Sequence, residues 1–310
     1  MKEFEAEFGK KFGLKNVAAV NSGTAALELA YEIAGIGEGD EVITPVLTCT
    51  ATNIPLIHRK ATIVFADTDK DLNVSISDIK KKITPKTKAI VFVHFGGNNR
   101  GLKELLTLCK EKKIILIEDA AQAVGSDFWG KADFTCVSLQ AIKTLTSGDG
   151  GFIICKNKDD HAKAKRLRWF GYDRDAKQRL GDTDLVEAGY KYHMNDITAA
   201  IGLGNLAVVD KLINHRKKLM AIYREAGFIS NIWMTAVLDD YAFFKEKLLE
   251  HGYDTGQHHY RNDKYSLFGG RKKFPMMDEI EKNYFFVPMH HDVTLADAKK
   301  IVKIIKTAKR

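Results

Sequence analysis

Cysteine and proline are scarce in this chain: 310 residues include four cysteines and five prolines. The cysteines, at positions 49, 109, 136 and 155, match no zinc or redox spacing, so reduced, buried thiols are expected. No apolar run approaches the roughly 18 residues of a membrane span. The opening MKEFEAEFGKKFG alternates charged residues with Phe, where a signal peptide needs an apolar stretch. These absences argue against a disulfide scaffold and a membrane protein, and they predict a cytoplasmic chain.

The glycine patterns of common nucleotide sites are also missing. Neither G-x-x-x-x-G-K-[ST] nor G-x-G-x-x-G occurs, which argues against a nucleoside triphosphate or dinucleotide cofactor. The chain is basic, since 48 Lys and Arg against 40 Asp and Glu give a net charge of +8. Its lysines alternate with apolar residues at helical spacing, which favours solvated helix faces over a nucleic-acid partner. The positive charge would also suit a small substrate that carries phosphates.

A chain of this length is large enough for two domains. In the first part, short apolar runs alternate with helical patterns, as in strands joined by crossover helices. Strands are predicted at 18–20, 41–45, 62–67, 89–95, 114–119, 134–140 and 151–156. Helices are predicted at 24–35, 99–113, 159–171 and 195–226, and from Leu295 onward. The pattern then becomes mixed, which predicts a large α/β domain over 1–208 and a smaller α+β domain over 209–310.

Ser22, Gly23 and Thr24 stand between a predicted strand and a predicted helix. Free backbone N–H groups and the dipole at a helix start attract anions, which favours a phosphate site. Ser and Thr also cap helices for purely structural reasons. These three residues alone leave both interpretations open.

Two acidic residues, Glu118 and Asp119, end the predicted strand 114–119. Ligands of open α/β sheets bind beyond the carboxyl ends of strands, and carboxylates after an apolar run are poorly placed for mere solvation. One of them is expected to meet a cation. The alternative is an edge charge paired with a surface lysine.

Ser138 lies near the end of the next predicted strand, and Lys143 follows it in a loop. Apolar neighbours such as Ile142 and Leu145 would desolvate Lys143 and lower the pKa of its amine, and an unprotonated lysine amine is the form that carbonyl chemistry needs. Judged alone, such a lysine would be a surface residue with a partly buried stem. Together with a phosphate site and a strand-end acid, it completes a site for pyridoxal phosphate.

The chain resembles the DegT family of fold type I, pyridoxal-phosphate-dependent nucleotide-sugar aminotransferases. The motifs that carry the resemblance are NSGTAALELAY, GDEVITP, EDAAQAVGS, S-x-x-x-x-K followed by GDGG, and GYKYHMNDITAAIGLGNL. The resemblance implies a mostly parallel, seven-stranded sheet flanked by helices, as in aspartate aminotransferase, with a smaller α+β C-terminal domain. Family members usually have a further helix and loop before KEFEAEFGKKFG, so the chain begins late by comparison.

The family's site residues map onto matching positions here. The resemblance implies that Lys143 is the Schiff-base lysine, Asp119 the partner of the pyridinium nitrogen and Gln122 the neighbour of the ring hydroxyl. The implied phosphate ligands are Ser22, Gly23, Thr24 and Ser138. In the family, the GYKYHM segment reaches the cofactor phosphate of the neighbouring subunit. Lys191 or His193 is therefore expected to complete the site across a homodimer interface.

One position departs from the family pattern. Cys49 stands where an aromatic side chain usually stacks on the pyridoxal ring, so stacking must be weaker or come from elsewhere. His94 is a candidate, and a histidine satisfied inside the sheet edge is the alternative. Because the family's T-G-x-H region approaches the substrate, His258 and Arg261 are candidate ligands of its phosphates or sugar. Adjacent histidines point to opposite sides of an extended segment, so no metal site is expected.

The leading hypothesis is an aminotransferase that uses an amino acid, commonly glutamate in the family, to convert a keto group on a nucleotide-linked sugar into an amine. A sugar dehydratase on the same scaffold is disfavoured, since it carries histidine in place of the lysine. A non-catalytic binding or regulatory protein of the same fold is also disfavoured. A decayed site loses its costly buried charges first, and Lys143 and Asp119 are retained.

Overall fold

A seven-stranded sheet forms the centre of the computed structural model, which describes residues 1–181, 184–185 and 187–308. Within these residues the strand order is β1-β7-β6-β5-β4-β2-β3. The strands are β1 (Val17–Val20), β2 (Glu41–Pro45), β3 (Thr62–Ala66), β4 (Thr87–Val93), β5 (Ile115–Asp119), β6 (Phe134–Ser138) and β7 (Gly151–Cys155). Pairing is parallel from β3 through β6, and β7 is antiparallel to both β6 and β1. The predicted mostly parallel sheet of seven strands is confirmed.

Both faces of this sheet are covered by helices, which explains why its strands are apolar almost throughout. In β4, Ala89, Val91 and Val93 pack on the side of α2 (Gly23–Ile33). Ile90 and Phe92, which alternate with them, pack on the side of α5 (Leu102–Lys112). Because successive side chains of a strand point to opposite faces, the same strand contributes to two separate apolar layers.

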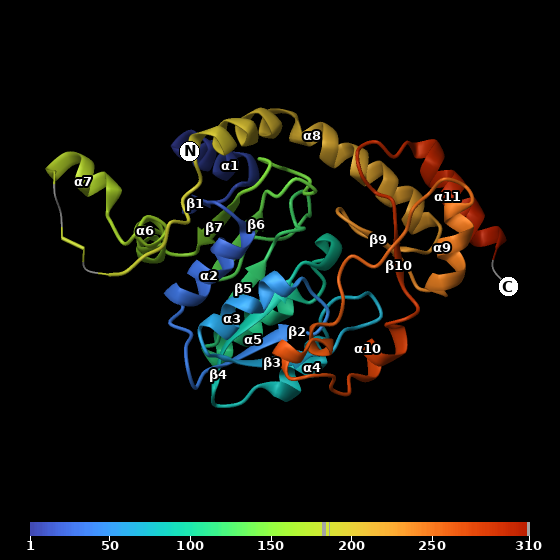
Figure 1. The fold of residues 1–310 in the computed structure, drawn as a ribbon, viewed down its shortest axis with the longest axis horizontal. Coiled ribbons are helices and arrows are strands. Elements are labelled where there is room, and N and C mark those ends of the chain that lie inside the picture. The colour runs from blue at the N-terminus through green and yellow to red at the C-terminus, as the bar shows by residue number, and fades with distance from the viewer. Residues whose placement is uncertain (182–183, 186, 309–310) are drawn as a thin grey trace.

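The remaining helices of the first part are α1 (Lys2–Phe12), α3 (Ile54–His58), α4 (Ile76–Lys82), α6 (Lys158–Leu167) and α7 (Arg174–Leu180). The sequence-based assignment omits α1, although Phe4 and Phe8 are one helical turn apart and both are fully buried. Their rings pack on Phe152 of β7, with centroid distances of 4.9 and 4.2 Å. In Figure 1, α7 projects away from the body of the molecule.

The long helix α8 (Asp196–Glu225) runs from the large sheet to a second, smaller body (Figure 1). There, β8 (Ile229–Ser230), β9 (Thr235–Val237) and β10 (Phe285–Val287) form an antiparallel sheet with α9 (Tyr241–Leu249) and α11 (Leu295–Thr307) beside it. The predicted smaller α+β part is therefore present. The boundary at residue 208 stays a prediction, because α8 runs through it unbroken.

The C-terminal part does not remain separate from the first. Helix α10 (Pro275–Ile280) lies against the region of β3 and α4 (Figure 1). The carboxylate of Asp67, which follows β3, accepts hydrogen bonds from the N–H groups of Met276 and Met277, both at 3.0 Å. An acidic side chain of the large sheet thereby caps a helix from the last quarter of the chain.

The cysteines follow the expectation only in part. Cys109, Cys136 and Cys155 are buried, whereas Cys49 is exposed. Burial raises the pKa of the Cys109 thiol to about 12. Across the described part of the chain, every helix is too short or too polar to cross a lipid bilayer.

Candidate active site

A cavity of about 390 Å³ lies beyond the carboxyl ends of three neighbouring parallel strands, β4, β5 and β6. Its wall contains the last residue of each strand and the first turn of α2. Open α/β sheets bind their ligands at this position. The cavity brings together most of the residues predicted to hold a cofactor, namely Ser22, Gly23, Thr24, Asp119, Gln122, Ser138 and Lys143.

The first turn of α2 lies directly against the end of β6. Ser22 caps the helix, since its hydroxyl accepts a hydrogen bond from the Ala25 N–H at 3.0 Å. Helix geometry leaves the N–H groups of Gly23 and Thr24 without intrahelical partners. A Cβ atom on Gly23 would lie 2.8 Å from the Cβ of Ser138, so the close approach requires glycine. Capping is thus present, and the free N–H groups can still bind an anion.

Asp119, the last residue of β5, presents a buried carboxylate to the cavity. One of its oxygens accepts a hydrogen bond from the Thr52 hydroxyl at 2.8 Å, and the other accepts one from the Ala121 N–H at 3.2 Å. Both donors are neutral groups. The negative charge therefore remains available to a cationic ligand.

Lys143 lies between β6 and β7, with its amine nitrogen 4.6 Å from the centre of the Trp233 ring. Burial lowers the pKa of this amine, and electrostatic interactions with Asp119 and Cys49 offset part of that effect. Of the neighbours expected to desolvate it, Leu145 is buried, whereas Ile142 is 63% exposed. A lowered pKa increases the fraction of unprotonated amine, which is the nucleophilic form.

Gln122 contacts a cavity residue that sequence reasoning missed. Its side-chain nitrogen lies 2.9 Å from Nε2 of His259, and its oxygen accepts a hydrogen bond from the Gly96 N–H at 2.6 Å. His259 lines the cavity, whereas the predicted His258 is exposed and stacks on Phe286. The histidine of this segment that reaches the cavity is therefore His259, one position later. The alternation of side chains along an extended segment is the signal that could have found it.

His94 lies inside the sheet edge and not in the cavity wall. Its ring is fully buried, and its Nε2 lies 2.7 Å from the carboxylate of Glu118. Burial raises the pKa of Glu118, but the His94 contact and N–H groups of residues 131–132 outweigh burial and lower it. The proposed stacking or substrate role of His94 is thus replaced by a structural one. Among the described residues of the cavity wall, His259 carries the only ring.

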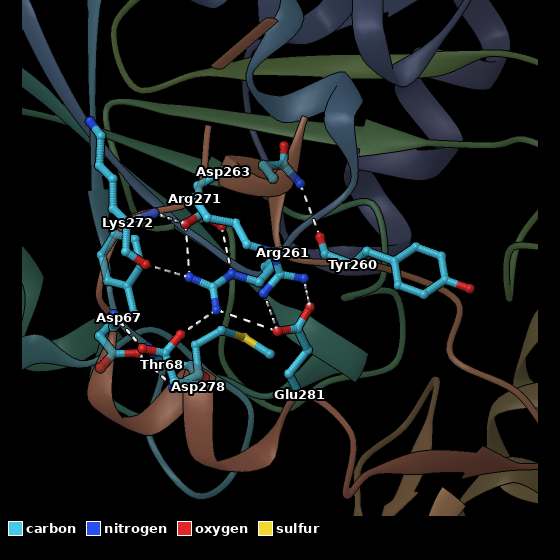
Figure 2. Close-up of polar contacts among 12 residues, drawn as sticks. Asp67, Thr68, Tyr260, Arg261, Asp263, Arg271, Lys272, Asp278 and Glu281 are labelled. Atoms are coloured by element: carbon cyan, nitrogen blue, oxygen red, sulfur yellow. Dashed lines mark hydrogen bonds and ion pairs between the residues drawn. The ribbon is translucent and has the colours of Figure 1, made fainter. Parts of the chain in front are cut away.

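Arg261 is likewise absent from the cavity wall, and Figure 2 shows where its charge is used. The side chain is 1% exposed, with Nε and Nη2 donating to the two oxygens of Asp263 at 2.7 and 2.8 Å. Its Nη1 donates to Asp278 and, at 3.4 Å, to Glu281. All three guanidinium nitrogens donate to carboxylates, one two residues away and two in or directly after α10. The expectation that Arg261 binds substrate is therefore corrected to a structural ion-pair role.

Lys191 and His193 do not line the cavity of their own chain. They lie on an extended segment that pairs with the end of β1, where the Asn21 N–H donates to the carbonyl of Tyr192 at 2.7 Å. Lys191 is exposed. His193 lines a different cavity, of about 610 Å³, with Trp169. The His193 ring packs edge-on against Trp169 with a centroid distance of 3.9 Å, and the role of both residues toward a second copy stays a prediction.

Pyridoxal phosphate fits the residues of the 390 Å³ cavity. A helix start suits its phosphate, a buried carboxylate with neutral hydrogen-bond donors suits its protonated ring nitrogen, and a lysine amine of lowered pKa suits its aldehyde. These three features come from different strands and helices, so their convergence on one cavity is stronger than any one of them alone.

A model of the DegT/DnrJ/EryC1/StrS aminotransferase family matches residues 1–228. The chain belongs to this family. Pyridoxal phosphate is the cofactor of the family, in agreement with the residues of the cavity. A putative sugar aminotransferase of Streptococcus pneumoniae, 25% identical to this chain, has been solved in the PMP form.

Individual members of the DegT/DnrJ/EryC1/StrS family show how far the likeness extends. The uncharacterized protein MJ1066 of Methanocaldococcus jannaschii is 36% identical over 72% of this chain and 61% of its own length. The GDP-perosamine synthase of Vibrio cholerae is 35% identical over 77% of this chain and 69% of its own. The sugar aminotransferase CalS13 of Micromonospora echinospora superposes with a TM-score of 0.92 at 31% identity, covering 99% of this chain and 91% of the other.

Proposed function

We propose that this protein transfers an amino group from an amino acid, with glutamate as the expected donor, to a keto group on a nucleotide-linked sugar. The observation that supports the proposal most directly is the placement of Lys143, Asp119 and the first turn of α2 around one cavity. The nucleotide part of the proposal rests on the name of the GDP-perosamine synthase relative. The positive net charge of +8 suits a substrate with phosphates.

The residues of the cavity divide the work of such a reaction. When bound, pyridoxal phosphate supplies an electron sink next to the carbon whose proton is removed. The start of α2 and Ser138 would hold the phosphate, and Asp119 would keep the ring nitrogen protonated. The Lys143 amine would take up and return a proton at its Nζ atom, and burial favours its unprotonated form by lowering its pKa.

The partner in this proposal is a second copy of the chain, with Lys191 or His193 of each copy reaching the cofactor phosphate of the other. Both residues lie outside their own cavity. The segment that carries them leads into α8, where Ile197, Ile201 and Val208 are 76%, 47% and 42% exposed. Apolar side chains gathered on one helix are typical of a surface that another chain covers.

The test of the function is turnover with defined substrates. Purified protein with pyridoxal phosphate is incubated with glutamate and with GDP- or UDP-linked 4-keto sugars, and the amino sugar and the 2-oxo acid are measured by mass spectrometry. We expect both products in equal amounts, and none from Lys143→Ala. Binding of cofactor and sugar nucleotide without either product would support the non-catalytic alternative. Loss of a sugar hydroxyl without amination would support the dehydratase.

A further inference from the structure

The amide of Gln122 is held in one orientation by a backbone donor. Gly96 lies in the turn after β4 with a positive φ of 66°, and its N–H points to the Gln122 oxygen at 2.6 Å. A backbone N–H can only donate, so the atom facing it must be the amide oxygen. A Cβ atom on Gly96 would approach Met234 to 3.2 Å, which together with the positive φ favours glycine at this position.

This orientation fixes the state of the ring on the other side. The Gln122 nitrogen faces Nε2 of His259 at 2.9 Å. An amide nitrogen only donates, so Nε2 of His259 must carry a lone pair, and its one N–H must lie on Nδ1. An imidazolium, or the other neutral tautomer, would place one N–H against another.

The surroundings of His259 favour this neutral form. The Tyr284 hydroxyl donates to the His259 carbonyl at 2.8 Å, and the Phe95 ring packs edge-on at 5.9 Å, so the segment is fixed on two sides. Burial is the main cause that lowers the pKa of His259 to about 4, and the positive charges of Lys143 and His258 add to it. The ring is therefore uncharged over the whole physiological pH range.

We propose that His259, as the neutral Nδ1–H tautomer, is a positioning residue that orients Gln122. It takes one of the two amide N–H groups and leaves the other for a ligand in the cavity. The orientation of Gln122 by His259 does not depend on the proposed function. Only the identity of the ligand, the ring hydroxyl of pyridoxal phosphate, rests on that function. The hydrogen-bonded series from Gly96 through Gln122 to His259 stands without it.

The first test uses the protein without cofactor. With ¹⁵N-labelled histidine, NMR at pH 7 should show a protonated Nδ1 and an unprotonated Nε2 for His259, assigned by the loss of its signals in His259→Gln. The pattern should persist to pH 5, because burial holds the pKa of His259 at about 4. An Nε2–H tautomer, or a charged His259 at pH 7, would overturn the proposal whatever the enzyme does.

The second test separates positioning from packing. His259→Gln keeps an acceptor for the Gln122 amide, whereas His259→Leu fills similar space without one. We expect the dissociation constant for pyridoxal phosphate to rise about fivefold in His259→Leu, the effect of one ordinary hydrogen bond, and to return to within about twofold in His259→Gln. His258→Leu is the control, with an unchanged constant. Equal losses in both His259 variants would leave only a packing role and contradict the proposal.

The two tests also distinguish this inference from the function. A protein that binds pyridoxal phosphate but does not turn over a sugar leaves the role of His259 intact. A protein that binds no pyridoxal phosphate contradicts the proposed function, and the NMR result on the cofactor-free chain still decides the tautomer. If His259→Leu fails to fold, the NMR measurement on the unmodified chain decides the proposal by itself.

Discussion

The amine nitrogen of Lys143 lies 4.6 Å from the centre of the Trp233 ring, so the lysine proposed to hold the cofactor contacts a side chain from the smaller body. Trp233 sits between β8 and β9, where its backbone N–H donates to the Gly96 carbonyl at 2.9 Å. Arg216 donates to the Trp233 carbonyl at 3.1 Å. The ring is thus held on its backbone, and it favours the ammonium form of Lys143 against the effect of burial.

Trp233→Leu should lower the pKa of Lys143 further, because the ring stabilises only the charged form. A cation–π contact of roughly 0.5–2 kcal/mol corresponds to a shift of up to about one unit. The measurement is the pH dependence of labelling of Lys143 by an amine reagent in cofactor-free protein, followed by mass spectrometry of its peptide. The midpoint should move to lower pH, and less so in Trp233→Phe. A midpoint that stays or rises would contradict the role of Trp233.

Arg261→Met should destabilise the protein strongly without acting on the cavity. Removing the guanidinium leaves the carboxylate of Asp263 buried and uncompensated, which typically costs about 3–5 kcal/mol. Urea unfolding monitored by tryptophan fluorescence measures this loss. The control is Arg271→Ala, since Arg271 pairs with Glu281 at the surface and should have a much smaller effect. Equal midpoints for both variants would be inconsistent with the ion-pair cluster shown in Figure 2.

Asp119→Asn should impair amino-group transfer far more than folding. The asparagine can still accept the Ala121 N–H, and the Thr52 hydroxyl can turn to accept instead of donate. The lost negative charge no longer favours a protonated ring nitrogen, and each unit of pKa lost there costs about tenfold. We expect the half-reaction with glutamate, followed by stopped-flow absorbance, to slow at least about tenfold at an unchanged unfolding midpoint. An unchanged rate would refute the assignment.

Complementation between inactive chains tests whether sites are shared. One variant carries Lys143→Ala, and the other carries both Lys191→Ala and His193→Ala. If each site combines residues of two copies, a mixed dimer contains one intact site, and a statistical mixture should recover about a quarter of the unmodified activity. Separately, each variant should be inactive or nearly so. Failure of the mixture to recover activity, although mixed dimers form, would mean that each site belongs to one chain.

Local patterns in the sequence predict much of this site. Asp119 and Ser138 end apolar strands, and Ser22 precedes an apolar-periodic helix, so a parallel sheet must bring these residues to one edge. The family motifs add Lys143 and Gln122 at their expected places. The strands and the longer helices follow from the same periodicities.

The features that sequence reasoning missed depend on contacts between distant segments. Trp233 reaches Lys143 only because the chain turns back toward the large sheet after α8, between β8 and β9, and no local pattern encodes that approach. Neighbouring side chains of an extended segment point to opposite sides, so an error of one position predicted His258 in the cavity where the structure places His259. Arg261 is the residue type that commonly binds phosphate, but its guanidinium is paired with the carboxylates of Asp263 and Asp278, which come later in the chain.

The most direct test of the account is the identity of the lysine that holds the cofactor. The protein is loaded with pyridoxal phosphate, reduced with borohydride so that the covalent link becomes permanent, digested and sequenced by mass spectrometry. We predict one labelled site, Lys143, together with loss of the visible absorbance band on reduction. Lys143→Ala should fold normally and take no label. Label on a different lysine, or none at saturating cofactor, would contradict the assignment of this cavity.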